Sequence, residues 1–144
     1  MHGVMTNHQF AMTNKCPITK GNKIFNIKDR AMELAVNTAN FIRNLTKNQL
    51  ANEYGKQLIR SSASIGANLI EADGALSKRD FINKLGISRR EAKETRYWLE
   101  LISRLNLTVN DQERTNNQLL IQETKEIVFI LSSIISNTKQ NEKS

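Results

Sequence analysis

Apolar residues recur along most of this chain at alternating spacings of three and four, the pattern that one buried helix face requires. Four such segments follow one another, and short polar breaks separate them. We therefore predict helices over residues 28–45, 50–72, 78–105 and 111–137.

Each predicted helix carries one stripe of core positions. In chain order the stripes are Ile27, Ala31, Leu34, Thr38, Phe41 and Leu45; Ala51, Tyr54, Leu58, Ser61, Ile65, Asn68 and Ala72; Phe81, Leu85, Ser88, Ala92, Thr95, Leu99 and Ile102; and Asn117, Leu120, Thr124, Ile127, Leu131 and Ile134. Small residues crowd the second helix, which we expect to be the most enclosed one, with Gly66 at a close helix contact.

The polar breaks contain residues typical of helix ends. Asn48, Ser77 and Asn110 are predicted N-caps, and Ser77 with Asp80 resembles a capping box. Gly74 is expected to end the second helix in the left-handed conformation. Short connections place sequential helices antiparallel and adjacent. The fold class is therefore all-α, an antiparallel up-down-up-down four-helix bundle over residues 24–138, with disordered tails at 1–23 and 139–144.

Composition agrees with an all-α chain. Among 144 residues there are one proline, Pro17, and six glycines, so little interrupts a helix. A lone cysteine, Cys16, forms no intrachain disulfide, and no stretch approaches the roughly 20 apolar residues that span a bilayer. Met1 to Lys15 lacks the apolar centre of a signal peptide, and Met5 and Met12 are alternative starts. We expect a cytoplasmic protein with no membrane association.

The net charge of +7 favours an anionic partner, nucleic acid first. Residues 1–23 contribute +3, and residues 77–108 contribute +4 from eight basic and four acidic side chains. On a helical wheel, one flank of the third helix gathers the candidate nucleic-acid-binding residues Lys78, Arg79, Arg89, Arg90, Lys93, Arg96 and Arg104. The alternative is a solvated face with the ion pairs Arg90–Glu94 and Arg96–Glu100.

The opposite flank of the same helix is apolar. It contains Ile87, Trp98, Leu101 and Leu105, which we interpret as an interface between subunits. The alternative is that Trp98 widens the core of the bundle.

Two segments resemble a known family. Residues 57–72 read QLIRSSASIGANLIEA and residues 81–101 read FINKLGISRREAKETRYWLEL. Both are similar to the bacterial four-helix bundle proteins, also called 23S ribosomal RNA intervening-sequence proteins, and weaker similarity extends from Ile24 to Asn137. The pairs Ser61-Ser62 and Ala72-Asp73 depart from the usual pattern, which weakens the transfer of any particular partner.

The resemblance implies an antiparallel bundle that assembles into a ring, commonly a homopentamer, with no established catalysis. A related branch comprises the accessory variability proteins of diversity-generating retroelements, which bind a reverse transcriptase and nucleic acid. RNA, DNA or a reverse transcriptase are therefore the partners that the resemblance suggests.

Several polar residues match the family motifs and are candidates for a structural network between helices. They are Arg60, Asn68, Glu71, Glu91 and Glu94. The two histidines, His2 and His8, precede the predicted bundle, and no serine has a histidine partner. We expect no enzyme activity, cofactor, metal or small-molecule substrate. Two functions stay open: nucleic-acid binding by a homo-oligomer, or a protein-interaction scaffold without nucleic acid.

Overall fold

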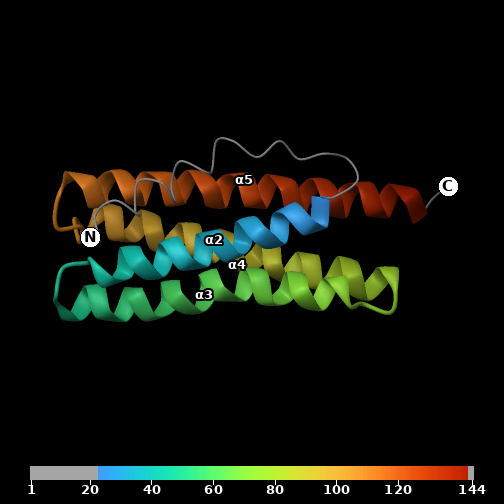
Figure 1. Ribbon diagram of the computed structural model, residues 1–144, viewed down its shortest axis with the longest axis horizontal. Coiled ribbons are helices and arrows are strands. Elements are labelled where there is room, and N and C mark those ends of the chain that lie inside the picture. Colours follow the sequence, from blue (N-terminus) through green and yellow to red (C-terminus); the bar gives the residue numbers. More distant parts are fainter. Residues whose placement is uncertain (1–22, 143–144) are drawn as a thin grey trace.

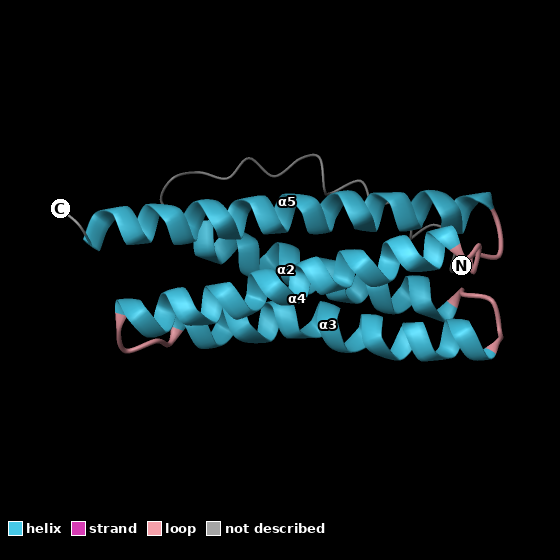
Figure 2. Ribbon diagram, turned by 180° about the vertical axis from the view of Figure 1, so that it is seen from behind, coloured by secondary structure: helices cyan, strands magenta, loops and turns pink. Residues whose placement is uncertain are grey.

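The computed structural model describes residues 23–142 as four consecutive helices, α2 (Lys23–Arg43), α3 (Gln49–Asp73), α4 (Lys78–Arg104) and α5 (Asp111–Glu142). Each packs against its neighbours in sequence, and α2 also packs against α5, which closes the bundle (Figure 1). Within this part of the chain all regular structure is helical (Figure 2). The predicted antiparallel four-helix bundle is confirmed.

The predicted helix bounds differ most at the two outer ends. Helix α2 begins five residues before the predicted start, and α5 continues five residues past the predicted end. The predicted tail over 139–144 is therefore helical as far as Glu142, whereas the tail over residues 1–22 lies outside the described residues. An apolar stripe marks where a helix is buried, and polar turns beyond the stripe can remain helical.

All three predicted N-caps are present. The side chains of Asn48, Ser77 and Asn110 accept hydrogen bonds from the backbone N–H of Ala51, Asp80 and Glu113, at 2.9, 3.1 and 2.8 Å. These bonds satisfy N–H groups that have no partner inside the helix.

The predicted left-handed end at Gly74 is wrong. Gly74 has φ −92° and ψ 8°, values open to any residue. The left-handed residue is Asn106, with φ 53°, just after α4. Asparagine tolerates this region better than most residues because its short amide can bond locally.

The core follows the predicted stripes closely. Ile27, Leu58, Leu85, Leu99 and Leu131 are fully buried. Two expectations for α3 fail: Asn68 is half-buried while the next residue, Leu69, is fully buried, and the small residues Ala63 and Ala67 are exposed. Helix α5 buries a larger share of its described residues than α3 does, so α3 is not the most enclosed helix.

Helix α2 packs on α3 beside two glycines of α3, Gly55 and Gly66. A Cβ atom added to Gly55 would lie 3.2 Å from Ile42 Cγ2, and one added to Gly66 would lie 3.6 Å from the Cβ of Ala31. Gly66 therefore faces α2, but a Cβ there would make only an ordinary van der Waals contact, so the tight contact expected at Gly66 lies at Gly55 instead.

The loops 44–48 and 105–110 meet at one end of the bundle. The backbone N–H and the hydroxyl of Thr46 both donate to the carbonyl oxygen of Leu107, at 3.0 and 2.7 Å. The α3–α4 loop lies at the opposite end (Figure 1). No helix over 23–142 is long and apolar enough to cross a membrane.

Candidate nucleic-acid interface

The basic flank of α4 is largely solvent-exposed. Of its seven basic residues only Arg96 has a carboxylate partner in the described part of the chain, and the six without one are Lys78, Arg79, Arg89, Arg90, Lys93 and Arg104. At 1.5 Å per residue, the 27 residues of α4 extend over about 40 Å. Cations spread along such a length can contact several phosphates of one nucleic-acid strand.

Arg90 is unpaired because its expected partner is used elsewhere. Glu94 forms an ion pair with Arg60 of α3 and accepts a hydrogen bond from Trp98 Nε1 at 3.2 Å. The other predicted pair, Arg96–Glu100, is present at 3.7 Å. The alternative of a self-neutralised basic face therefore holds for Arg96 but not for Arg90.

A groove between α4 and α5 concentrates positive charge. Its lining includes the four cations Arg89, Arg90, Lys93 and Lys139 and contains no aspartate or glutamate. Arg89 is held in place by a 3.2 Å hydrogen bond from its guanidinium to Ser132 Oγ of α5. Such a groove suits a phosphate group, because cations from two helices can surround it.

Lys139 was missed by the sequence analysis. It lies in the segment that was predicted to be a tail, and only the extension of α5 places it beside Lys93 in this groove. The sequence pattern does not indicate that Lys139 and Lys93 lie in the same groove.

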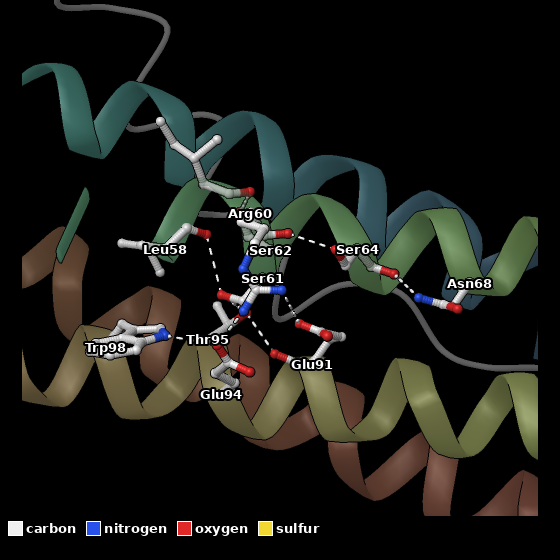
Figure 3. A network of polar contacts seen from close by, with 11 residues as sticks. Leu58, Arg60, Ser61, Ser62, Ser64, Asn68, Glu91, Glu94, Thr95 and Trp98 are labelled. Carbon is white, nitrogen blue, oxygen red and sulfur yellow. Dashed lines mark hydrogen bonds and ion pairs between the residues drawn. The ribbon is translucent and has the colours of Figure 1, made fainter. Parts of the chain in front are cut away.

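The polar residues between α3 and α4 form a network on that side of the bundle (Figure 3). Arg60 forms ion pairs with Glu94 and, at 3.7 Å, with Glu91. Deeper in the core, Thr95 Oγ1 lies 2.9 Å from Ser61 Oγ and 2.8 Å from the carbonyl oxygen of Glu91. These contacts satisfy buried hydroxyls and favour one register of the two helices.

The other two residues proposed for this network, Asn68 and Glu71, bond to partners other than the side chains of Arg60, Glu91 and Glu94. The amide of Asn68 donates to the carbonyl oxygen of Ser64, 2.8 Å away in the same helix. Glu71 pairs with Lys84 of α4 at 2.7 Å, and this hydrogen bond and charge raise the pKa of Lys84. Both pairs lie nearer the α3–α4 loop than Arg60 does.

Trp98 of the apolar flank is half-buried within its own chain. Its ring stacks on Tyr54 of α3, with centroids 5.8 Å apart, and meets the ring of Tyr97 edge-on at 5.1 Å. It therefore packs against the bundle core, as in the alternative interpretation. Of the other three residues, Ile87 lines the cationic groove, Leu101 is half-buried and Leu105 is 41% exposed.

A more exposed apolar surface occurs on α2 and α3, and the sequence analysis missed it. Its exposed members are Met32, Val36, Ile59 and Ile70. The contacts of Gly55 with Ile42 and of Gly66 with Ala31 place these stretches of the two helices side by side. We call Met32, Val36, Ile59 and Ile70 the α2–α3 apolar surface.

A charged cluster joins α2 to α5 and was also unforeseen. Arg30 donates to Glu123 at 2.7 and 3.0 Å and to Glu126 at 2.5 Å. Burial acts to lower the pKa of Arg30, but the two carboxylates together raise it. Burial raises the pKa of Glu123, more than the bonds and charge of Arg30 lower it. A raised carboxylate pKa can mark an active site, but here an arginine occupies both carboxylates.

Over residues 23–142 no three His, Cys, Asp or Glu side chains are grouped to hold a metal ion. His2, His8 and Cys16 lie outside the described residues.

The fold and the basic face define a small four-helix bundle protein with a candidate anion-binding surface. The family described as 23S rRNA-intervening sequence protein matches residues 23–133, and the chain belongs to this family.

A solved structure similar to this chain is that of a protein of unknown function from the S23 ribosomal protein family of Bacteroides thetaiotaomicron VPI-5482. It shares 39% sequence identity with a TM-score of 0.66, over 79% of this chain and 98% of that chain. The curated proteins contain no match.

Proposed function

We propose that this protein is a non-catalytic bundle that binds nucleic acid through the basic face of α4. The observation that carries the proposal is the groove between α4 and α5, which is lined by Arg89, Arg90, Lys93 and Lys139 and by no aspartate or glutamate. Phosphates binding there would release counterions, which makes the affinity depend on salt. The family's description, which names a ribosomal RNA insertion, supports RNA as the first ligand to test.

The test compares two variants of equal net charge. The variant Arg90→Glu/Lys93→Glu changes the groove, and the control Lys47→Glu/Lys56→Glu changes two exposed lysines away from it. Binding of a fluorescently labelled RNA is followed by anisotropy over a range of salt concentrations. The groove variant should weaken binding at least tenfold and reduce the slope of log affinity against log salt by roughly 0.7–0.9 for each phosphate that the variant no longer neutralises.

Equal weakening in the two variants would show that only the overall charge matters. Unchanged binding in the groove variant would remove the groove from the proposal.

A second candidate function is self-association, or scaffolding through another protein, by means of the α2–α3 apolar surface. Met32, Ile59 and Ile70 are each at least half exposed. Burying such a patch between copies would remove apolar area from water. A ring of copies would also repeat the basic face and increase avidity for a long nucleic acid.

Light scattering of the full chain tests this candidate. Met32→Glu/Ile59→Glu should reduce the mass towards that of a 16.4 kDa monomer, whereas Phe129→Glu, an exposed aromatic on α5, should leave it unchanged. Trp98→Ala distinguishes an interface on the α2–α3 apolar surface from one on the apolar flank of α4. A loss of subunits in that variant alone would assign the interface to the flank containing Trp98.

A further inference from the structure

Tyr97 is an exposed aromatic residue in the middle of the basic face. Its side chain is 58% exposed although it lies on a helix that packs against two others. Lys93 precedes it by four residues, and Arg90 precedes and Arg104 follows it by seven. At 3.6 residues per turn these spacings place all four on one face of α4.

The neighbours of Tyr97 fix the position of its ring. Trp98 meets it edge-on, with an interplanar angle of 77°. Trp98 itself is held by stacking on Tyr54 and by its hydrogen bond to Glu94. A ring that is fixed on one side and exposed elsewhere loses little conformational freedom when a planar ligand stacks on it.

An aromatic ring among unpaired cations is the combination that binds single-stranded nucleic acid. Cations contact the phosphates, and bases stack on the ring regardless of their sequence. In a duplex the base faces are covered by neighbouring bases, so Tyr97 would have nothing to stack on. The cations alone would bind both forms, and the ring alone distinguishes them.

We infer that Tyr97 stacks on an unpaired base and gives the protein a preference for single-stranded over double-stranded nucleic acid. This inference rests on the proposed nucleic-acid binding at the same face. It assigns different roles to the two kinds of residue: Arg90, Lys93 and Arg104 supply affinity, and Tyr97 supplies discrimination between strands.

Trp98 offers a built-in reporter, because it is the single tryptophan of the chain and touches Tyr97. A 15-nucleotide single strand, as RNA and as DNA, and a 15-base-pair duplex are titrated at one salt concentration. Both tryptophan fluorescence and anisotropy of the labelled oligonucleotide are recorded.

The variants are Tyr97→Ala, Tyr97→Phe, which keeps the ring, and Phe129→Ala as the matched control on α5. Tyr97→Ala should weaken single-strand binding about 5- to 100-fold and leave duplex binding within twofold. Tyr97→Phe and Phe129→Ala should bind the single strand like the wild type. Single-strand binding should change the emission of Trp98 more than duplex binding does.

Equal binding of single strand and duplex by the wild type would overturn the inference and leave the proposed function intact. An equal loss for both ligands in Tyr97→Ala would do the same. A change of mass in Tyr97→Ala by light scattering would assign Tyr97 to a contact between copies instead. A wild type that binds neither form would overturn both the inference and the proposed function.

Discussion

The two seams α3–α4 and α2–α5 run along the same bundle but are built differently. The α3–α4 seam buries small hydroxyls that find partners across it: Thr95 lies within hydrogen-bond distance of Ser61, and Ser88 donates to the carbonyl oxygen of Ile65 at 2.8 Å. Leu58, Ile65 and Leu99 are fully buried on these helices. This seam combines close apolar packing with satisfied hydroxyls, and its one buried polar side-chain atom without a hydrogen bond in the described chain is Glu91 Oε2, 3.7 Å from the guanidinium of Arg60.

The α2–α5 seam relies on charge and on larger amides. Arg30 bonds to Glu123 and Glu126 near one end, and Asn44 donates to Glu113 at 3.1 Å near the other. Between these levels, buried atoms of Asn37, Thr38 and Asn117 lack a hydrogen-bond partner within the described chain.

The difference shows how this bundle separates stability from specificity. Buried ion pairs contribute little net stability because desolvation offsets their attraction, yet breaking one is costly. Helices α2 and α5 are also far apart in sequence, so no short loop sets their register. We expect charge to select the register of this seam, and packing to select that of α3–α4.

The largest expected change in stability follows from a substitution in the charged cluster of Arg30, Glu123 and Glu126. Arg30→Met would leave Glu123 buried beside Glu126 without a cation, at a cost of about 3–5 kcal/mol in the free energy of unfolding at neutral pH. Without Arg30 the pKa of Glu123 rises further. The folded state then binds protons more readily than the unfolded state, so the loss should shrink as pH falls through that raised pKa. Urea denaturation at several pH values measures this.

The double variant Arg30→Met/Glu123→Leu provides the control, because it removes both charges of the pair. It should recover most of the lost stability. A loss in Arg30→Met that is independent of pH would indicate a packing defect instead.

A smaller change in the free energy of unfolding, of opposite sign, is expected in the middle of the α2–α5 seam. Asn117 is fully buried, and neither its amide nitrogen nor its amide oxygen has a partner within the described chain. Asn117→Leu has a similar shape and removes both polar atoms, so it should raise the free energy of unfolding by about 1–3 kcal/mol. Thermal unfolding followed by circular dichroism tests this, and destabilisation would contradict it.

The smallest effect is expected at the α3–α4 seam. Ser61→Ala removes one hydroxyl, while Thr95 keeps the carbonyl oxygen of Glu91 as its partner. The loss should be about 0.5–1.5 kcal/mol because no buried group is orphaned. Chemical denaturation of Ser61→Ala beside Ser64→Ala, whose hydroxyl bonds only within α3, isolates the contribution across the seam. A loss as large as that of Arg30→Met would abolish the distinction between the seams.

Much of the fold could be predicted because its signals are local. The caps at Asn48, Ser77 and Asn110 depend on residues within three positions, and the core stripes depend on a period of 3.6. The same local reasoning misplaced Asn68, because a stripe in a long helix drifts to the adjacent residue, Leu69. It also placed a left-handed residue at Gly74 rather than Asn106, because either residue suits that conformation.

The candidate site was predicted only in part. The basic flank of α4 follows from spacing along one helix. The charge state of that flank does not, because Glu94 can pair with Arg90 in its own helix or with Arg60 in the next one, and the structure shows Arg60. The sequence pattern allowed Trp98 two environments, and only the structure shows that its ring stacks on Tyr54 of α3 within the same chain.

The sequence by itself determined the number of helices, their order, most of their ends and the residues that face the core. Periodicity and capping act within one helix, where chain neighbours are also neighbours in space. The tertiary structure alone decided which charges remain unpaired, that Lys139 joins the cationic groove, and that Arg30 lies between two glutamates about 90 residues away. These pairings depend on how one helix is placed against another, and that placement is set by the packing of all four helices together.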